Sequence, residues 1–322
     1  MTKTEQQFDF SYLRGQREPQ SVLIAVGGGK GGVGKSFVSS SLALLLAHRG
    51  FDTVLVDLDL GSANLHTYLG QGPTQKGINE YLLQPELKFQ DVISPTPFPH
   101  LRFVSGASEQ LNVSTLQEGQ KGRLMSALYN TPADFIVLDL SAGAHDTTLD
   151  FFLMASRQVI VMTPEPSSME NAYGFMKAAF YRKLKRHEKQ LRLGGLLGQL
   201  MAKRQELGIR TPADLLQMVL LKEPERGLQL KKVMRDLSFE IVLNQARSQN
   251  DANLGPSIKT VCNKYFGVSA NLLGSLDYDN AVWQALRKRR PVLLEYPHSR
   301  LYTQLTTISR QFANVPFKRA VV

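Results

Sequence analysis

Short apolar runs alternate along the chain with longer segments whose apolar positions recur on a helical period. Seven runs have the length and β-branched character of buried strands, at residues 21–26, 53–57, 101–105, 135–139, 159–163, 239–244 and 272–276. Buried strands that alternate with helices are typical of a parallel sheet covered on both faces. We therefore predict an α/β fold with a doubly wound, mostly parallel sheet of seven to eight strands and helices on both faces.

Three segments depart from this rhythm. Residues 1–20 are polar and are expected to form an arm, with "FDFSYLR" as a docking turn or short helix, while residues 21–322 form the main domain. The proline-rich stretch "SPTPFP" at 94–99 is typical of a connector. Between about residues 184 and 237 no run has strand character, which predicts a helical insertion. Within it, Thr211 is expected to cap a helix that has Pro212 in its first position and Asp214 in its first turn.

The insertion is also basic. Residues 181–236 contain 14 Lys and Arg against 6 Asp and Glu, so 8 of the chain's 10 net positive charges lie there. Such a charge run can be the solvated face of the helices or a surface that binds a partner. The sequence leaves both interpretations open.

Composition limits the classes of protein. The only cysteine is Cys262, which excludes a disulfide framework and a cysteine-ligated metal within one chain. The beginning of the sequence lacks the apolar core of a signal peptide, and no apolar run approaches the roughly 18 residues that span a membrane. These features favour a cytoplasmic protein. The net charge of +10 permits contact with nucleic acid, anionic lipid or an acidic protein without selecting one.

The last helical pattern has a single apolar face. "RLYTQLTTISRQF" places Leu301, Leu305, Ile308 and Phe312 on that face, among polar Thr and Gln and few basic residues. A basic amphipathic membrane helix would carry more cations opposite its apolar stripe. We therefore expect this segment to pack on the core.

The stretch "GGGKGGVGKS" carries the candidate chemistry. Gly29, Gly34, Lys35 and Ser36 fit the phosphate-binding pattern G-x-x-x-x-G-K-[ST], and the stretch lies between an expected strand and an expected helix. In such a loop, backbone N–H groups surround phosphates, the lysine reaches the terminal phosphates and the hydroxyl binds Mg²⁺. The sequence thus predicts a P-loop ATPase domain, with a second lysine, Lys30, that most such loops do not need.

Three aspartates end strands near this loop. Asp57 and Asp59 lie two residues apart in "VDLDLGSANL", and Asp139 ends the strand of "VLDLSAGAHD". Phosphoryl transfer needs Mg²⁺ and a positioned water, and carboxylates at strand ends can serve both. A structural role, in which a strand-end aspartate caps the next helix, fits Asp57 reasonably and Asp139 poorly.

Four motifs in register resemble one family. "KGGVGKS", "VDLDLGSANL", "LDLSAGAHD" and "VMTPEPSSMENAYGFMK" resemble the MinD/ParA family of deviant Walker-A ATPases, most of all its MinD branch and the FlhG/FleN regulators of flagellar number and placement. The resemblance covers residues 21–177 and resumes at 241–248 and 274–299. Ser36 stands where threonine is commoner in the family. The insertion is not part of the family's minimal core, and "QQFDFSYLR" shares only the outline of the activating motif in the FlhG/FleN arm.

The resemblance implies roles for these residues, with ATP and Mg²⁺ as ligands. Lys30 matches the family's signature lysine, which reaches across a dimer interface to the partner's ATP. Asp59 would position or activate the hydrolytic water, and Ser36, Asp57 and Asp139 would organise the metal. Asn244 matches the adenine-reading position, and Asp277 matches the loop that closes over the base. The nucleotide loop would comprise Gly29, Gly31, Gly32, Val33, Gly34, Lys35, Ser36 and Phe37.

Two functions follow as expectations. The first is a slow, partner-stimulated ATP hydrolase whose ATP-bound homodimer recruits a partner or a membrane surface to set the position or number of a flagellum or division site. The second is a ParA-type ATPase that segregates DNA, with the basic insertion and "RKRR" at 287–290 binding DNA without sequence preference. Iron–sulfur relatives need more cysteines than this chain has.

Overall fold

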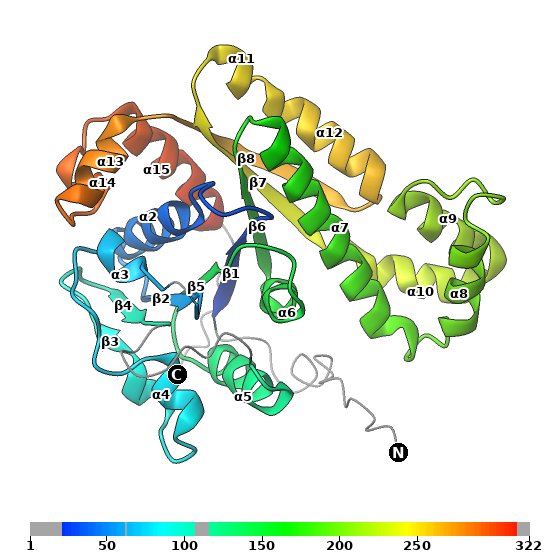
Figure 1. The fold of residues 1–322 in the computed structure, drawn as a ribbon, viewed down its shortest axis with the longest axis horizontal. Coiled ribbons are helices and arrows are strands. Elements are labelled where there is room, and N and C mark those ends of the chain that lie inside the picture. The colour runs from blue at the N-terminus through cyan, green and yellow to red at the C-terminus, as the bar shows by residue number, and fades with distance from the viewer. Residues whose placement is uncertain (1–20, 62, 107–115, 314–322) are drawn as a thin grey trace.

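The computed structural model describes residues 21–61, 63–106 and 116–313. The predicted arm at 1–20 lies outside the described residues. An eight-stranded sheet in the order β3-β4-β2-β5-β1-β6-β7-β8 runs through the molecule (Figure 1). Its strands are β1 (Val22–Gly27), β2 (Thr53–Leu58), β3 (Ser94–Pro95), β4 (Leu101–Val104), β5 (Phe135–Leu140), β6 (Arg157–Met162), β7 (Ser238–Ala246) and β8 (Ser269–Asp277).

The predicted fold class is confirmed. All seven predicted strands are present, and every pairing is parallel except that of β3 with β4. The interpretation of residues 94–99 as a connector was incomplete, because Ser94 and Pro95 pair with β4 as an antiparallel edge strand. Proline is tolerated at an edge because its missing N–H faces away from the ladder.

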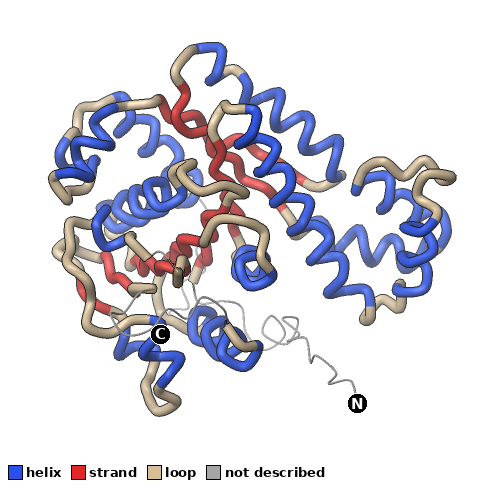
Figure 2. Tube along the Cα trace, in the orientation of Figure 1, coloured by secondary structure: helices blue, strands red, loops and turns tan. Residues whose placement is uncertain are grey.

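Helices cover both faces of the sheet (Figure 2). They are α2 (Lys35–His48), α3 (Leu65–Tyr68), α4 (Ile78–Leu83), the 3₁₀-helix η1 (Phe89–Val92), α5 (Glu118–Tyr129), α6 (Asp146–Met154), α7 (Pro166–Glu188), α8 (Gly194–Ala202), α9 (Pro212–Lys222), α10 (Pro224–Arg235), α11 (Gln249–Ala252), α12 (Leu254–Phe266), α13 (Asn280–Arg287), α14 (Val292–Glu295) and α15 (Arg300–Ala313).

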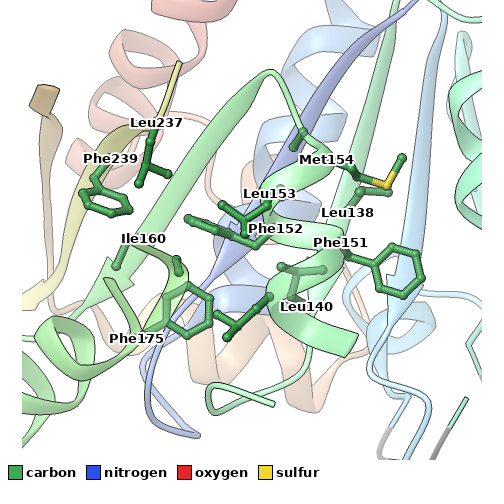
Figure 3. Packing of buried hydrophobic residues seen from close by; sticks show 14 of the residues in the cluster. Leu138, Leu140, Phe151, Phe152, Leu153, Met154, Ile160, Phe175, Leu237 and Phe239 are labelled. Carbon is green, nitrogen blue, oxygen red and sulfur yellow. The ribbon is translucent and has the colours of Figure 1, made fainter. Parts of the chain in front are cut away.

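Alternate residues of the strands pack into two separate hydrophobic cores, one on each face of the sheet. In β5, Leu138 and Leu140 belong to the same core as Phe152 of α6 and Phe175 of α7, whereas Val137 belongs to the core on the other face, which includes residues of α2 and α15 (Figure 3). This alternation follows from the two-residue period of a strand. The four predicted stripe residues of α15 are buried in the second core, which confirms it as a core-packing helix.

The segment predicted to be a helical insertion, residues 184–237, comprises the end of the long helix α7 and the helices α8, α9 and α10 at one edge of the molecule. Thr211 caps α9 as predicted, because its hydroxyl accepts the N–H of Asp214 at 3.1 Å. Part of the positive charge counted in this region is internal. Arg182 and Arg186, both on α7, form ion pairs with the buried carboxylate of Asp150 on α6. Those two cations therefore do not contribute to a surface of the insertion.

Candidate functional site

The phosphate-binding loop connects β1 to α2 at the carboxyl edge of the sheet. β5 lies beside both β1 and β2, and its Asp139 is in register with Val26 and with Asp57. The carboxyl ends of parallel strands meet at one edge of a sheet, and this edge is where α/β folds bind ligands. The tertiary structure therefore brings the predicted loop and the predicted carboxylates together.

Two glycines of the loop are required by their surroundings. Gly34 has a φ of 95°, a conformation that side chains rarely adopt, and a Cβ there would lie 2.1 Å from the Asn244 amide nitrogen. A Cβ on Gly29 would lie 2.0 Å from the carbonyl oxygen of Asn171 on α7. By contrast, nothing lies within 4 Å of the Cβ positions of Gly31 and Gly32. The loop is thus packed against Asn171 and Asn244 at Gly29 and Gly34 and has free space at Gly31 and Gly32.

Lys35 is buried at the first position of α2. Burial lowers the pKa of its ammonium, although the carboxylates of Asp139 and Asp59 oppose this shift. Its Nζ lies 3.4 Å from the carbonyl oxygen of Lys30, within the loop. Val33 and Phe37 have buried side chains, so only their backbone groups can face a ligand.

Asp139 and Asp57 are buried carboxylates. Burial raises the pKa of Asp139 to about 6, against the opposing effects of hydrogen bonds from Ser36 and Ser39 and the charge of Lys35. Burial and then the charge of Asp139 raise the pKa of Asp57 well above its usual range. Two buried carboxylates that are costly to ionise favour a cation nearby.

The surroundings of Asp57 match the structural alternative considered for it. Its carboxylate accepts the N–H of Leu65, the first residue of α3, and the N–H of Asp59, each at 3.1 Å. Asp59 follows the end of β2 and is half-buried. Asp57 therefore holds the loop that carries Asp59, whatever else it binds.

The donor set fits Mg²⁺ bound together with phosphate. Within the three described ranges, no three His, Cys, Asp or Glu side chains form a group that could hold a metal ion. Mg²⁺ commonly takes one or two protein oxygens and completes its shell with phosphate oxygens and water. Ser36 at the start of α2, with Asp139 hydrogen-bonded to it, supplies such a partial shell.

Sequence analysis did not single out Ser39, which is fully buried. Its hydroxyl donates to Asp139 at 2.9 Å and so orients the carboxylate. The signal was present in the sequence, because "SSS" at 39–41 interrupts an otherwise apolar helix one turn after Ser36.

The side chain of Lys30 is half exposed and contacts α7 of its own chain. Its ammonium donates to the hydroxyl of Ser167 at 3.2 Å and lies 3.9 Å from the carboxylate of Glu165, at the start of α7. Both partners belong to the "TPEPSS" stretch. Lys30 is therefore part of the phosphate-binding loop, but its side chain lies at the surface and contacts the start of α7.

Asn244 lies against the loop, and Asp277 lies farther along the edge of the sheet. The Asn244 amide donates to the carbonyl oxygen of Val33 at 2.8 Å. Asp277 pairs with Arg300 at 3.1 Å and lines a cavity of about 420 Å³, in which the guanidinium of Arg247 lies 4.3 Å from the ring centroid of Tyr278. The other lining residues are Ala246, Ser248, Gln249 and Ala252.

The glycine loop, the buried lysine and the paired carboxylates on a parallel sheet define a P-loop NTPase fold. Residues 24–292 match the family described as the CobQ/CobB/MinD/ParA nucleotide binding domain, so the chain belongs to this family. The predicted relationship to MinD/ParA ATPases is thereby confirmed.

Individual relatives extend the comparison. The chain is 26% identical over 295 residues to the antiactivator FleN of Pseudomonas aeruginosa. This match covers 91% of the chain and 87% of FleN. It is 36% identical over 166 residues to the flagellum site-determining protein YlxH of Helicobacter pylori, but this match covers only 48% of the chain and 52% of YlxH. The chain thus spans about half the length of YlxH.

A solved structure shows the same fold. The septum site-determining protein MinD of Pyrococcus horikoshii, complexed with Mg-ADP, superposes with a TM-score of 0.63 at 20% identity, covering 91% of this chain and 96% of that protein. Among the described residues, no helix is both long enough and apolar enough to cross a membrane.

Proposed function

We propose that this protein is an ATP-hydrolysing regulatory switch that works as an ATP-dependent homodimer. One observation carries the proposal: the phosphate-binding loop has a second lysine, Lys30, whose side chain is 45% exposed, while the lysine of the P-loop pattern, Lys35, is buried. A cation that enters the neighbouring subunit's site would stabilise phosphate charge there and tie dimerisation to ATP occupancy.

Within one subunit, Lys35 and the loop amides bind the phosphates, and Ser36 and Asp139 hold Mg²⁺. When bound, Mg²⁺ neutralises charge on the phosphate oxygens. Asp59 orients the attacking water, because Asp57 accepts its backbone N–H and so holds Asp59 at the carboxyl end of β2, beside the phosphate-binding loop. Asn244 and Asp277 contact the base, together with the stacked pair of Arg247 and Tyr278.

The output of the switch is the placement or number of a flagellum or division site. Two kinds of relative support this proposal by their names: a flagellum site-determining protein and a septum site-determining protein. We propose that the ATP-bound dimer recruits a protein partner or activator, either in the cytoplasm or at the inner face of the cell membrane.

DNA segregation of the ParA type is the alternative function. The basic residues of the insertion that do not pair with Asp150 favour it.

The test of the dimer is Lys30→Ala. The variant should still bind ATP, because Lys35 and the loop amides remain, but it should not dimerise with a slowly hydrolysed ATP analogue, and hydrolysis should fall with dimerisation. Lys30→Arg should also fail, because a planar fork does not replace a point charge between glycines. Light scattering on wild type and both variants measures the effect. Dimerisation at the wild-type level would show that Lys30 faces only solvent.

The test of hydrolysis is Asp59→Ala. This variant should bind ATP normally, turn over slowly or not at all and persist as a dimer, since only the water-positioning carboxylate is removed. Turnover at the wild-type rate would refute the role given to Asp59. Duplex DNA added to this ATP-bound form distinguishes the alternative, because ATP-dependent binding with a steep salt dependence would favour DNA segregation.

A further inference from the structure

The helices α13 and α14 lie at the edge of the molecule opposite the insertion (Figure 1). Apolar and basic side chains are exposed on these helices and on the turn between them. Trp283 is the only tryptophan of the chain, and 59% of it is exposed. Leu294 on α14 is also 59% exposed. We call the exposed residues Trp283, Arg287, Arg289, Arg290 and Leu294 the α13–α14 patch.

The exposure of Trp283 follows from the pattern of α13. Ala281 and Ala285 face the core and are buried, so Trp283 and Arg287, one turn apart, face outward. The guanidinium of Arg287 lies 4.8 Å from the centroid of the Trp283 ring. A cation held on an exposed tryptophan gives the patch an apolar body with a charged rim.

The patch has excess positive charge. Residues 283–295 contain four Lys and Arg against the single acid Glu295, a net charge of +3. Glu295 contacts Lys288 at 2.5 Å and Arg290 at 3.3 Å, and 70% of the Arg290 side chain stays exposed. One carboxylate therefore does not neutralise the cluster.

The backbone beneath the patch is held in place. A Cβ on Gly70, after α3, would lie 2.5 Å from the carbonyl oxygen of Arg289, so the turn packs tightly on that glycine. The hydroxyl of Tyr296 hydrogen-bonds the Gln284 side chain at 2.6 Å and joins the segments on either side of the turn. The patch is thus presented on a fixed surface.

We propose that the α13–α14 patch binds an anionic phospholipid surface. Tryptophan is favoured where an apolar region meets water at a bilayer surface, and each nearby Lys or Arg adds attraction to anionic headgroups. Phosphates of duplex DNA would attract the same cations but offer no apolar layer for Trp283 and Leu294. The apolar stripe of α15 is buried in the core and cannot serve this purpose. The inference rests on the proposed function for its biological purpose, but its test needs no nucleotide.

The experiment uses the full chain without nucleotide and vesicles of phosphatidylcholine with or without phosphatidylglycerol. Because Trp283 is the only tryptophan, its emission reports the patch directly. Emission should shift to shorter wavelength with phosphatidylglycerol vesicles only, and high salt should reverse the shift. In vesicle co-sedimentation, Arg287→Ala and Arg290→Ala should each bind about fivefold more weakly, and Leu294→Ser should also bind more weakly.

The matched control lies on the insertion. Leu228, which is 60% exposed, and Lys231 place an exposed apolar and a basic side chain on α10, so Leu228→Ser and Lys231→Ala should bind vesicles as wild type does.

The proposal is overturned if anionic vesicles do not shift the emission of wild type, if the patch variants bind vesicles as well as wild type does, or if only the control variants lose binding. A shift that rises with protein concentration alone would assign the patch to a second copy, and competition by duplex DNA would assign it to nucleic acid. ATP turnover of the same proteins separates a failure of this inference from a failure of the switch.

Discussion

At the scale of single residues, the site combines groups whose charges burial disfavours. Lys35 has a lowered pKa, and Asp57 and Asp139 have raised ones, with burial as the main cause each time. Natural sites keep such groups where a ligand later compensates the cost. The nucleotide-free protein should therefore be less stable than the same fold with neutral side chains at these positions.

Asp139→Asn tests this cost. The carboxyl has a pKa near 6 in the folded protein and about 3.9 when unfolded, so the folded state binds more protons between these values. The contribution of Asp139 to wild-type stability should thus fall as pH rises from about 4 to about 6, and the variant should lose this contribution while Asp57 keeps its own. At pH 7 the free energy of unfolding of the variant should exceed that of wild type by on the order of 1–3 kcal/mol. Urea denaturation of both proteins at about pH 4 and about pH 7 measures this difference. A variant that is less stable than wild type at about pH 7 would contradict the expectation.

At the scale of elements, α7 joins the nucleotide loop to the insertion. Its first turn contacts Lys30, and its backbone at Asn171 closes on Gly29. Farther along, Arg182 and Arg186 hold Asp150 of α6, the helix that follows β5 and its Asp139. The helices α6 and α7 are therefore tied together by a buried ion-pair network.

Asp150→Asn should loosen this connection. Burial opposes ionisation of Asp150, but hydrogen bonds from Arg182 and Lys121 and the charge of Arg186 outweigh it and lower the pKa of the carboxyl. Its removal takes the buried carboxylate away from three cations, of which Lys121 and Arg182 keep only the more exposed Glu118 and Asp146, so the free energy of unfolding should fall by about 3–5 kcal/mol. The control is Asp146→Asn, whose carboxylate pairs with Arg182 but is 75% exposed, and which should cost less than about 1 kcal/mol. Equal losses in the two variants would argue against a buried network.

At the scale of the whole molecule, nucleotide should act as a stabilising ligand of the folded state. A ligand at about 100 times its Kd adds roughly 2.7 kcal/mol to the free energy of unfolding. ATP with Mg²⁺ should thus raise the Tm of wild type by several degrees, and removal of Mg²⁺ by a chelator should reduce the gain. Lys35→Ala should show no gain, because the phosphates lose their main cation. An unchanged gain in that variant would refute the assignment of Lys35.

Local chemistry in the sequence determined seven of the eight strands in the described sheet, the strand–loop–helix order around Lys35 and the burial of α15. Periodicity and loop composition are properties of neighbouring residues, so they can be read before the chain is folded. Only the tertiary structure placed Ser39 on Asp139, 100 residues away, and Asn244 on the carbonyl of Val33, 211 residues away. It also revealed that Asp57 caps α3 and that Arg182 and Arg186 neutralise Asp150 instead of facing a partner. Such contacts depend on which strands become neighbours in the sheet, and that order arises from packing of the whole chain, not from the residues beside each position.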